Sequence, residues 1–176
     1  VLYLAVATVP AVFAGIFFEN RIESAFIPSV VIWMLMITGL AVGSTYFVKH
    51  RSRREFTYMI VLYIGFAQAF ALLPGISRSG ITISVALLMG IKHHEAAKFA
   101  FFMAIPALLG ASLLQMIKID DLQQIALFPL IIGLLTAAVT GYLVINWLLA
   151  VISKGKFYLF SFYCVTIAII TYIVIN

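Results

Sequence analysis

Long apolar runs recur along the whole of this 176-residue chain, and they constrain its fold more than any other feature. An α-helix needs about 20 mostly apolar residues to cross the hydrocarbon core of a bilayer. Hydrophobic residues make up 65% of the chain, charged residues only 10%, and the mean hydropathy is +1.18. We therefore predict an all-α, polytopic membrane protein that forms a single transmembrane domain over residues 1–176. Its expected transmembrane helices, about five, cover residues 1–18, 29–48, 97–117, 127–152 and 157–175.

Two further apolar segments, residues 56–73 and 81–91, flank a short polar break that begins with Pro74 and Gly75. The second segment would be about 16 Å long as a helix, so it cannot cross a core of about 30 Å alone. Two topologies compete. Residues 56–73 cross the membrane and leave the break outside, or residues 56–91 form a re-entrant hairpin with the break at its tip.

The distribution of basic residues favours the hairpin, because cytoplasmic loops carry an excess of Lys and Arg. In the hairpin topology the loops at 49–55, 92–98 and 153–156 share one side of the membrane. They hold eight basic residues: Lys49, Arg51, Arg53, Arg54, Lys92, Lys98, Lys154 and Lys156. The other side holds two basic residues among four acidic ones: Arg21 and Lys118, with Glu19, Glu23, Asp120 and Asp121. Membrane orientation thus explains the net charge of +5, and we expect no nucleic-acid partner.

Arg78 is the only charged residue between Glu55 and Lys92, and it lies in the break between Ser77 and Ser79. A guanidinium at membrane depth is costly unless a partner or a wet cavity compensates for it. Its planar fork matches the oxygens of a phosphate group, and serine hydroxyls add further donors. These residue types therefore predict an oxyanion site at the break.

The backbone of the break supports the same prediction. Gly75 and Gly80 let backbone N–H groups approach a ligand closely, and Gly80 precedes the predicted helix at 81–91. The N-terminus of that helix would attract an anion, with Thr82 in its first turn. An alternative remains open: Arg78 reaches the interface or pairs with a distant loop carboxylate, and the serines only cap the helix.

The segment LPGISRSGITIS, residues 73–84, with Gln68 six residues before Pro74, resembles the second signature of the bacterial undecaprenyl-diphosphate phosphatases, the bacitracin-resistance family. The following segment ALLMGIKHHEAAKFAFFMAIPALLGA is similar too, and the resemblance extends from about Val1 to the end of the chain. It implies a helical fold of inverted repeats with two re-entrant hairpins. It also implies a multi-pass enzyme of the bacterial inner (plasma) membrane. This hydrolase removes the terminal phosphate of a C55 isoprenoid diphosphate and so recycles the carrier for peptidoglycan synthesis and cell wall biogenesis.

The resemblance assigns roles residue by residue. Arg78, Ser77 and Ser79 match the catalytic part of the second signature, and four residues match its substrate-binding part: Gly75, Gly80, Thr82 and Gln68. It further implies a divalent cation, Mg or Ca, whose ligands are not in this chain, and a homodimer as a candidate assembly. The sequence itself predicts no metal site.

The family's first signature, a glutamate-rich helix leading into Pro-x-Ser-Ser-Thr-Gly-His, has no counterpart here. We therefore expect the nucleophile and the general base to lie before Val1, so that this chain alone lacks part of the active site and the C-terminal two-thirds of the family is represented. Attack by Ser77 or Ser79 is the weaker alternative, since no base is near them in sequence. Two other functions remain open: a transporter or flippase of the lipid phosphate, which can use similar half-helices, and a membrane scaffold without a ligand.

Overall fold

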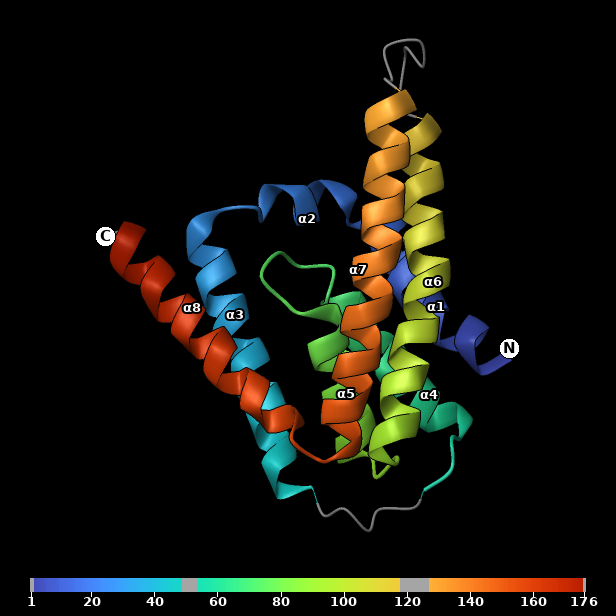
Figure 1. The fold of residues 1–176 in the computed structure, drawn as a ribbon, viewed down its shortest axis with the longest axis vertical. Coiled ribbons are helices and arrows are strands. Elements are labelled where there is room, and N and C mark those ends of the chain that lie inside the picture. The colour runs from blue at the N-terminus through green and yellow to red at the C-terminus, as the bar shows by residue number, and fades with distance from the viewer. Residues whose placement is uncertain (1, 49–53, 118–126, 176) are drawn as a thin grey trace.

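The computed structural model describes residues 2–48, 54–117 and 127–175, and these residues are helical and contain no strand (Figure 1). The all-α prediction is confirmed. The α-helices are α1 (Leu2–Phe17), α2 (Glu19–Ser24), α3 (Pro28–Ser44), α4 (Tyr58–Phe70), α5 (Arg78–Leu88), α6 (His93–Ile117), α7 (Leu127–Ser153) and α8 (Phe160–Ile175). Two 3-10 turns, η1 (Thr45–Phe47) and η3 (Phe157–Leu159), extend α3 and lead into α8.

Four helical stretches among the described residues are long and apolar enough to cross a membrane: Pro28–Phe47, His93–Leu113, Phe128–Ser153 and Phe157–Ile175. They correspond to four of the five predicted spans. The remaining one, α1, has 16 residues with Pro10 inside it, so it is about 24 Å long and shorter than predicted. Large apolar side chains are exposed along α7 from Phe128 to Trp147, which suits contact with lipid. The chain is a multi-pass membrane protein.

Helices α4 and α5 form a hairpin, and the segment that leads into α4 pairs with the segment that follows α5. They have 13 and 11 residues, about 20 and 16 Å, so neither reaches across a bilayer core. At the base of the hairpin the Arg54 N–H donates to the Gly90 carbonyl at 3.1 Å, and Arg54 pairs with Ile91 in an isolated parallel bridge. This geometry is compatible with the re-entrant topology, which stays a prediction. The predicted helix at 56–73 is too long, because the chain turns after Phe70.

The described basic loops gather at one end of the molecule (Figure 1). His94 Nδ1 lies 3.2 Å from Ser153 Oγ, which joins the start of α6 to the end of α7 beside the hairpin base. Helix α2, with its two glutamates, lies at the other end (Figure 1). This arrangement agrees with the predicted charge split. Six of the charged residues used there lie outside the described residues: Lys49, Arg51, Arg53, Lys118, Asp120 and Asp121.

The hairpin is held between two helix pairs. On one side α1 runs beside α4 so closely that a Cβ at Gly65 would lie 2.6 Å from the Ala7 carbonyl oxygen. On the other side α3 crosses α8 at Gly39, whose carbonyl accepts a hydrogen bond from Ser161 Oγ at 2.6 Å. Small residues permit such close crossings in membrane proteins. The first contact joins the hairpin to α1, and the second joins α8 to α3, which in turn packs against α5 of the hairpin.

Candidate functional site

The break between α4 and α5 turns sharply at Gly75, whose φ is +91°. A Cβ there would lie 2.5 Å from the carbonyl oxygen and 2.9 Å from the Cα of Val31 in α3. The close approach that requires glycine is therefore to the backbone of a neighbouring helix. Sequence reasoning attributed this glycine to ligand approach, and the structure gives it a packing role as well.

Ser77 starts α5 and fixes the break to α3. Its Oγ accepts a hydrogen bond from the Gly80 N–H at 3.1 Å, and its own N–H donates to Thr38 Oγ1 at 3.1 Å. The serine is thus the N-cap, and the predicted helix start at residue 81 is wrong by three residues because the cap acts earlier. Gly80 accordingly lies inside the first turn instead of before the helix. The sequence left open whether the serines cap the helix, and Ser77 does so in the structure.

Arg78 and Ser79 are the first two residues of α5. The first N–H groups of a helix have no acceptor within it. Those of Gly80 and Ile81 are bonded to Ser77, which leaves the N–H groups of Arg78 and Ser79 without an acceptor among the described residues. The helix therefore presents two free backbone donors and its positive end at the tip of the hairpin.

The Arg78 guanidinium is partly buried and has no ion pair or hydrogen bond with any residue that the structure describes. Pairing with a loop carboxylate, the alternative to anion binding, is thus not observed within residues 2–48, 54–117 and 127–175. A guanidinium without a partner, on the residue that begins a helix with two free N–H groups, is well suited to an anion with several oxygens.

Thr82 and Gln68 lie away from any surface that a ligand could reach in this structure. Thr82 is 1% exposed, and its hydroxyl donates to the Arg78 carbonyl at 2.8 Å from the second turn of α5, so its predicted place in the first turn is wrong. Gln68 is also 1% exposed, and neither atom of its amide has a hydrogen-bond partner among the described residues. A buried amide without hydrogen bonds lowers the free energy of unfolding by about 1–3 kcal/mol. Substrate contact by these two residues stays a prediction.

A cavity of about 360 Å³ opens beside the first turn of α5. The break contributes Gly75, Ile76, Ser77, Ser79 and Gly80 to its lining, whereas Arg78 does not line it. The other walls come from α3, α7, η3 and α8: Leu35, Thr38, Val42, Leu148, Phe157, Phe160, Tyr163 and Cys164. Sequence reasoning missed these residues, because apolar residues in a membrane span carry no signal of what they face.

The model of one protein family, described as Bacitracin resistance protein BacA, matches residues 1–170. The chain belongs to the BacA family. It is 34% identical over 180 residues to a Bacteroides fragilis protein and 38% identical over 176 residues to a Thermodesulfovibrio yellowstonii protein. It is also 36% identical over 165 residues to a Methanothermobacter thermautotrophicus protein. All three relatives are named undecaprenyl-diphosphatase.

The matches cover 99%, 98% and 90% of this BacA-family chain, in the order Bacteroides, Thermodesulfovibrio and Methanothermobacter. They cover 68% of the first two relatives and 91% of the third. The chain thus spans about two thirds of the longer relatives. The break with Arg78 lies inside the segment that the family shares.

Within the described part of this BacA-family chain, no three His, Cys, Asp or Glu side chains come close enough to hold a metal ion. The residues that line the cavity at the tip include no carboxylate and no imidazole. The described residues therefore do not fit the divalent cation that the family resemblance implies, and we derive no catalytic step through it.

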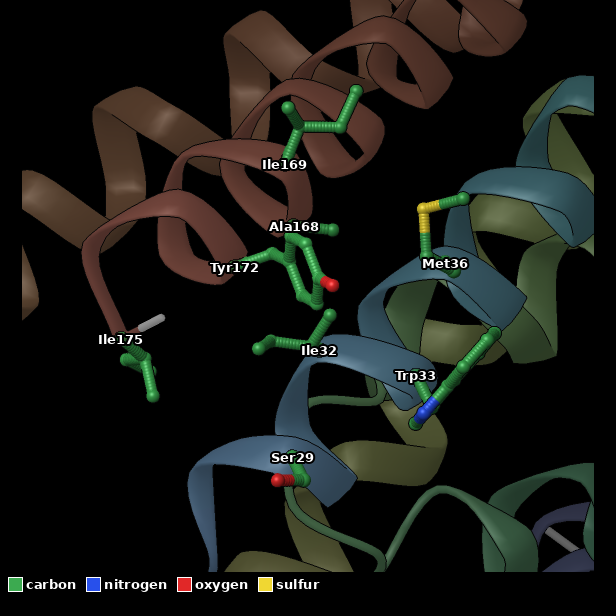
Figure 2. A pocket seen from close by; sticks show the side chains of 8 residues that line it. All are labelled: Ser29, Ile32, Trp33, Met36, Ala168, Ile169, Tyr172 and Ile175. Atoms are coloured by element: carbon green, nitrogen blue, oxygen red, sulfur yellow. The ribbon is translucent and has the colours of Figure 1, made fainter.

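A second opening, of about 460 Å³, lies where α3 and α8 splay apart (Figure 2). Figure 2 shows Ile32 of α3 and Tyr172 of α8 pointing toward one another across it. Its lining is apolar except for Ser29, Trp33 and Tyr172 and includes no charged residue. It offers nothing to hold a phosphate, so the candidate anion site remains the tip of the hairpin.

Replacing Ser77 by alanine is expected to lower both stability and phosphate binding. The lost cap should cost about 1 kcal/mol of unfolding free energy and free the Gly80 N–H. Thr57 is a matched control, since its hydroxyl caps α4 through the Ile60 N–H at 3.4 Å, far from the tip. Thermal unfolding in detergent should show a loss in Ser77→Ala and Thr57→Ala, whereas affinity for diphosphate should fall only in Ser77→Ala. Equal affinities in the two variants would show that Ser77 only caps α5 and does not contribute to diphosphate binding.

Proposed function

We propose that this BacA-family chain acts in the hydrolysis of undecaprenyl diphosphate to undecaprenyl phosphate and inorganic phosphate. The observation that carries the proposal is the unpaired guanidinium of Arg78 at the free N-terminus of α5, within a hairpin too short to cross the membrane. The names of the relatives supply the substrate, since each is an undecaprenyl-diphosphatase. A lipid diphosphate has its charge at one end, which suits a cationic site among apolar helices.

In the proposed reaction a water molecule attacks the terminal phosphorus, and the bond from that phosphorus to the bridging oxygen breaks. Negative charge grows on the bridging oxygen and is shared with the equatorial oxygens of the transferred group. Arg78 and the N–H groups of Arg78 and Ser79 would stabilise this charge through fixed donors in a site of low dielectric constant. The Ser77 and Ser79 hydroxyls would donate to the remaining phosphate oxygens.

The group that activates the attacking water is a separate question from the group that holds the phosphates. The cavity lining includes no side chain that could accept the proton at neutral pH, and Ser77 Oγ already accepts the Gly80 N–H. We therefore propose that the residues of the break provide binding and electrostatic stabilisation. The proton acceptor and any bound Mg or Ca would come from groups other than those lining the cavity.

The cellular setting follows from the proposed reaction. The product is the monophosphate carrier used in peptidoglycan synthesis and cell wall biogenesis, so we propose the plasma (inner) membrane as the location and bacitracin resistance as one consequence. We also propose a homodimer, in which apolar side chains that are exposed in the single chain would be buried.

The decisive experiment uses the protein expressed from its complete gene and purified in detergent, without any membrane gradient. Release of inorganic phosphate from an isoprenoid diphosphate is the expected result. Binding of the lipid without release would overturn the proposal. The rival function, transport of the lipid phosphate, finds no support in the names of the relatives reported above.

A further inference from the structure

We propose that the cavity beside the first turn of α5 holds the first isoprene units of the lipid diphosphate. The proposal rests on the proposed function, because it assigns the apolar part of the same substrate. The cavity and the anion site share Ser77, Ser79 and Gly80, so a molecule bound with its diphosphate at the helix N-terminus can extend its chain directly into the cavity.

Four residues with hydroxyl groups line the cavity, Thr38, Ser77, Ser79 and Tyr163, and the hydroxyls of Thr38 and Ser77 take part in hydrogen bonds within the protein. Thr38 Oγ1 donates to the Met34 carbonyl at 3.0 Å and accepts the Ser77 N–H at 3.1 Å. Ser77 Oγ accepts the Gly80 N–H. Of the other two, Ser79 lies in the first turn of α5 and Tyr163 is 66% exposed, and no charged side chain lines the cavity. An anionic group bound in the cavity would therefore find few partners, whereas an alkyl chain could occupy it without breaking a hydrogen bond of the protein.

The walls and the size of the cavity indicate which part of the lipid it takes. Three of its walls, α3, α7 and α8, belong to stretches long enough to span the membrane, so a chain leaving the cavity enters the bilayer. Its volume of about 360 Å³ lies near the lower end of ligand pockets, about 300–1,000 Å³. It can thus hold only the part of a long isoprenoid next to the diphosphate.

Filling the cavity separates this inference from the proposed function. The variants are Leu35→Trp in α3 and Leu148→Trp in α7, which fill it from two walls. Leu143→Trp is the matched control, because Leu143 lies on the same helix α7, does not line the cavity and is 62% exposed. The probes are methylenediphosphonate, a head group alone, and its farnesyl ester, which adds three isoprene units and cannot be hydrolysed at the P–C–P link.

Binding of both probes to the protein in detergent gives the answer. Both filled variants should bind methylenediphosphonate within about twofold of the unmodified protein. Their affinity for the farnesyl ester should fall by at least about tenfold, whereas the control variant should bind both probes as before. Unchanged farnesyl affinity in the filled variants, or an equal loss for both probes, would overturn the inference. A phospholipid found by native mass spectrometry and expelled by Leu35→Trp without loss of farnesyl affinity would assign the cavity to that lipid instead. Failure of the proposed function looks different: the unmodified protein would bind neither probe or release no phosphate.

Discussion

Replacing Arg78 by alanine is expected to lower the rate of phosphate release from the lipid diphosphate by about 1,000-fold. The reason is that the guanidinium has no partner among the described residues, so its charge is available to the transition state instead of a neighbouring carboxylate. Arg78 is also the first residue of α5, where its own backbone N–H and that of Ser79 have no acceptor among the described residues. The measurement is inorganic phosphate released per minute by purified protein in detergent.

Two controls make the result specific. Arg78→Lys keeps the charge and loses the planar fork, so an intermediate rate is expected. Lys154→Ala removes an exposed basic residue from the loop between α7 and η3, at the end of the molecule where the hairpin base lies, and should leave the rate unchanged. A near-normal rate in Arg78→Ala would remove this residue from the reaction and leave the helix N-terminus as the anion site.

Replacing Gly75 by alanine is expected to destabilise the fold by roughly 3 kcal/mol or more, because two costs add. The φ of +91° is strained for any residue with a Cβ. That Cβ would also lie 2.5 Å from the Val31 carbonyl oxygen, which belongs to the backbone of α3 and cannot rotate away. Separation of the hairpin tip from α3 would relieve the clash and would displace Ser77 from Thr38. Thermal unfolding in detergent should show a large loss, accompanied by weaker binding of diphosphate.

Gly133→Ala is the matched control for Gly75→Ala. An added Cβ at Gly133 meets nothing within 4 Å, and the residue lies inside α7. Alanine is the better helix former by about 1 kcal/mol, so this variant should be as stable as the unmodified protein or more stable. If Gly75→Ala unfolds at the same temperature as Gly133→Ala, the break is free to move and the geometry described for the tip is wrong.

The hairpin shows where sequence reasoning succeeds and where it stops. An apolar segment of 11 residues is too short to cross a membrane whatever it packs against, so length alone could predict that this helix does not span the bilayer. The ends of the two helices could not. Residues 71–73 are as apolar as those before them, yet the chain turns there because Gly75 must reach the backbone of α3. Likewise α5 starts at Arg78 because Ser77 is fixed by Thr38, which is 39 residues away.

The candidate site divides in the same way. The serines, the arginine and the glycines stand together in eight residues, so the chemistry of anion binding is local and could be inferred from residue types. The use of each hydroxyl depends on its neighbours. The Ser77 hydroxyl caps α5, the Thr82 hydroxyl donates to the Arg78 carbonyl, and the hydroxyl and N–H of Ser79 donate to no described residue. The apolar cavity is formed by helices from distant parts of the chain, and no local pattern distinguishes Leu35 or Leu148 from leucines that face lipid.

The sequence by itself determined that this protein is a helical membrane protein and predicted an anion site at Arg78, because hydropathy, helix length and residue chemistry are properties of short segments. Only the tertiary structure decided that Arg78 begins a helix, that Gly75 contacts α3 and that an apolar cavity adjoins the first turn of α5. These features depend on the crossing of α3 with α8 and on the packing of α3 against the hairpin tip. Such crossings join residues far apart in the chain, and their positions follow from side-chain packing that no single segment contains.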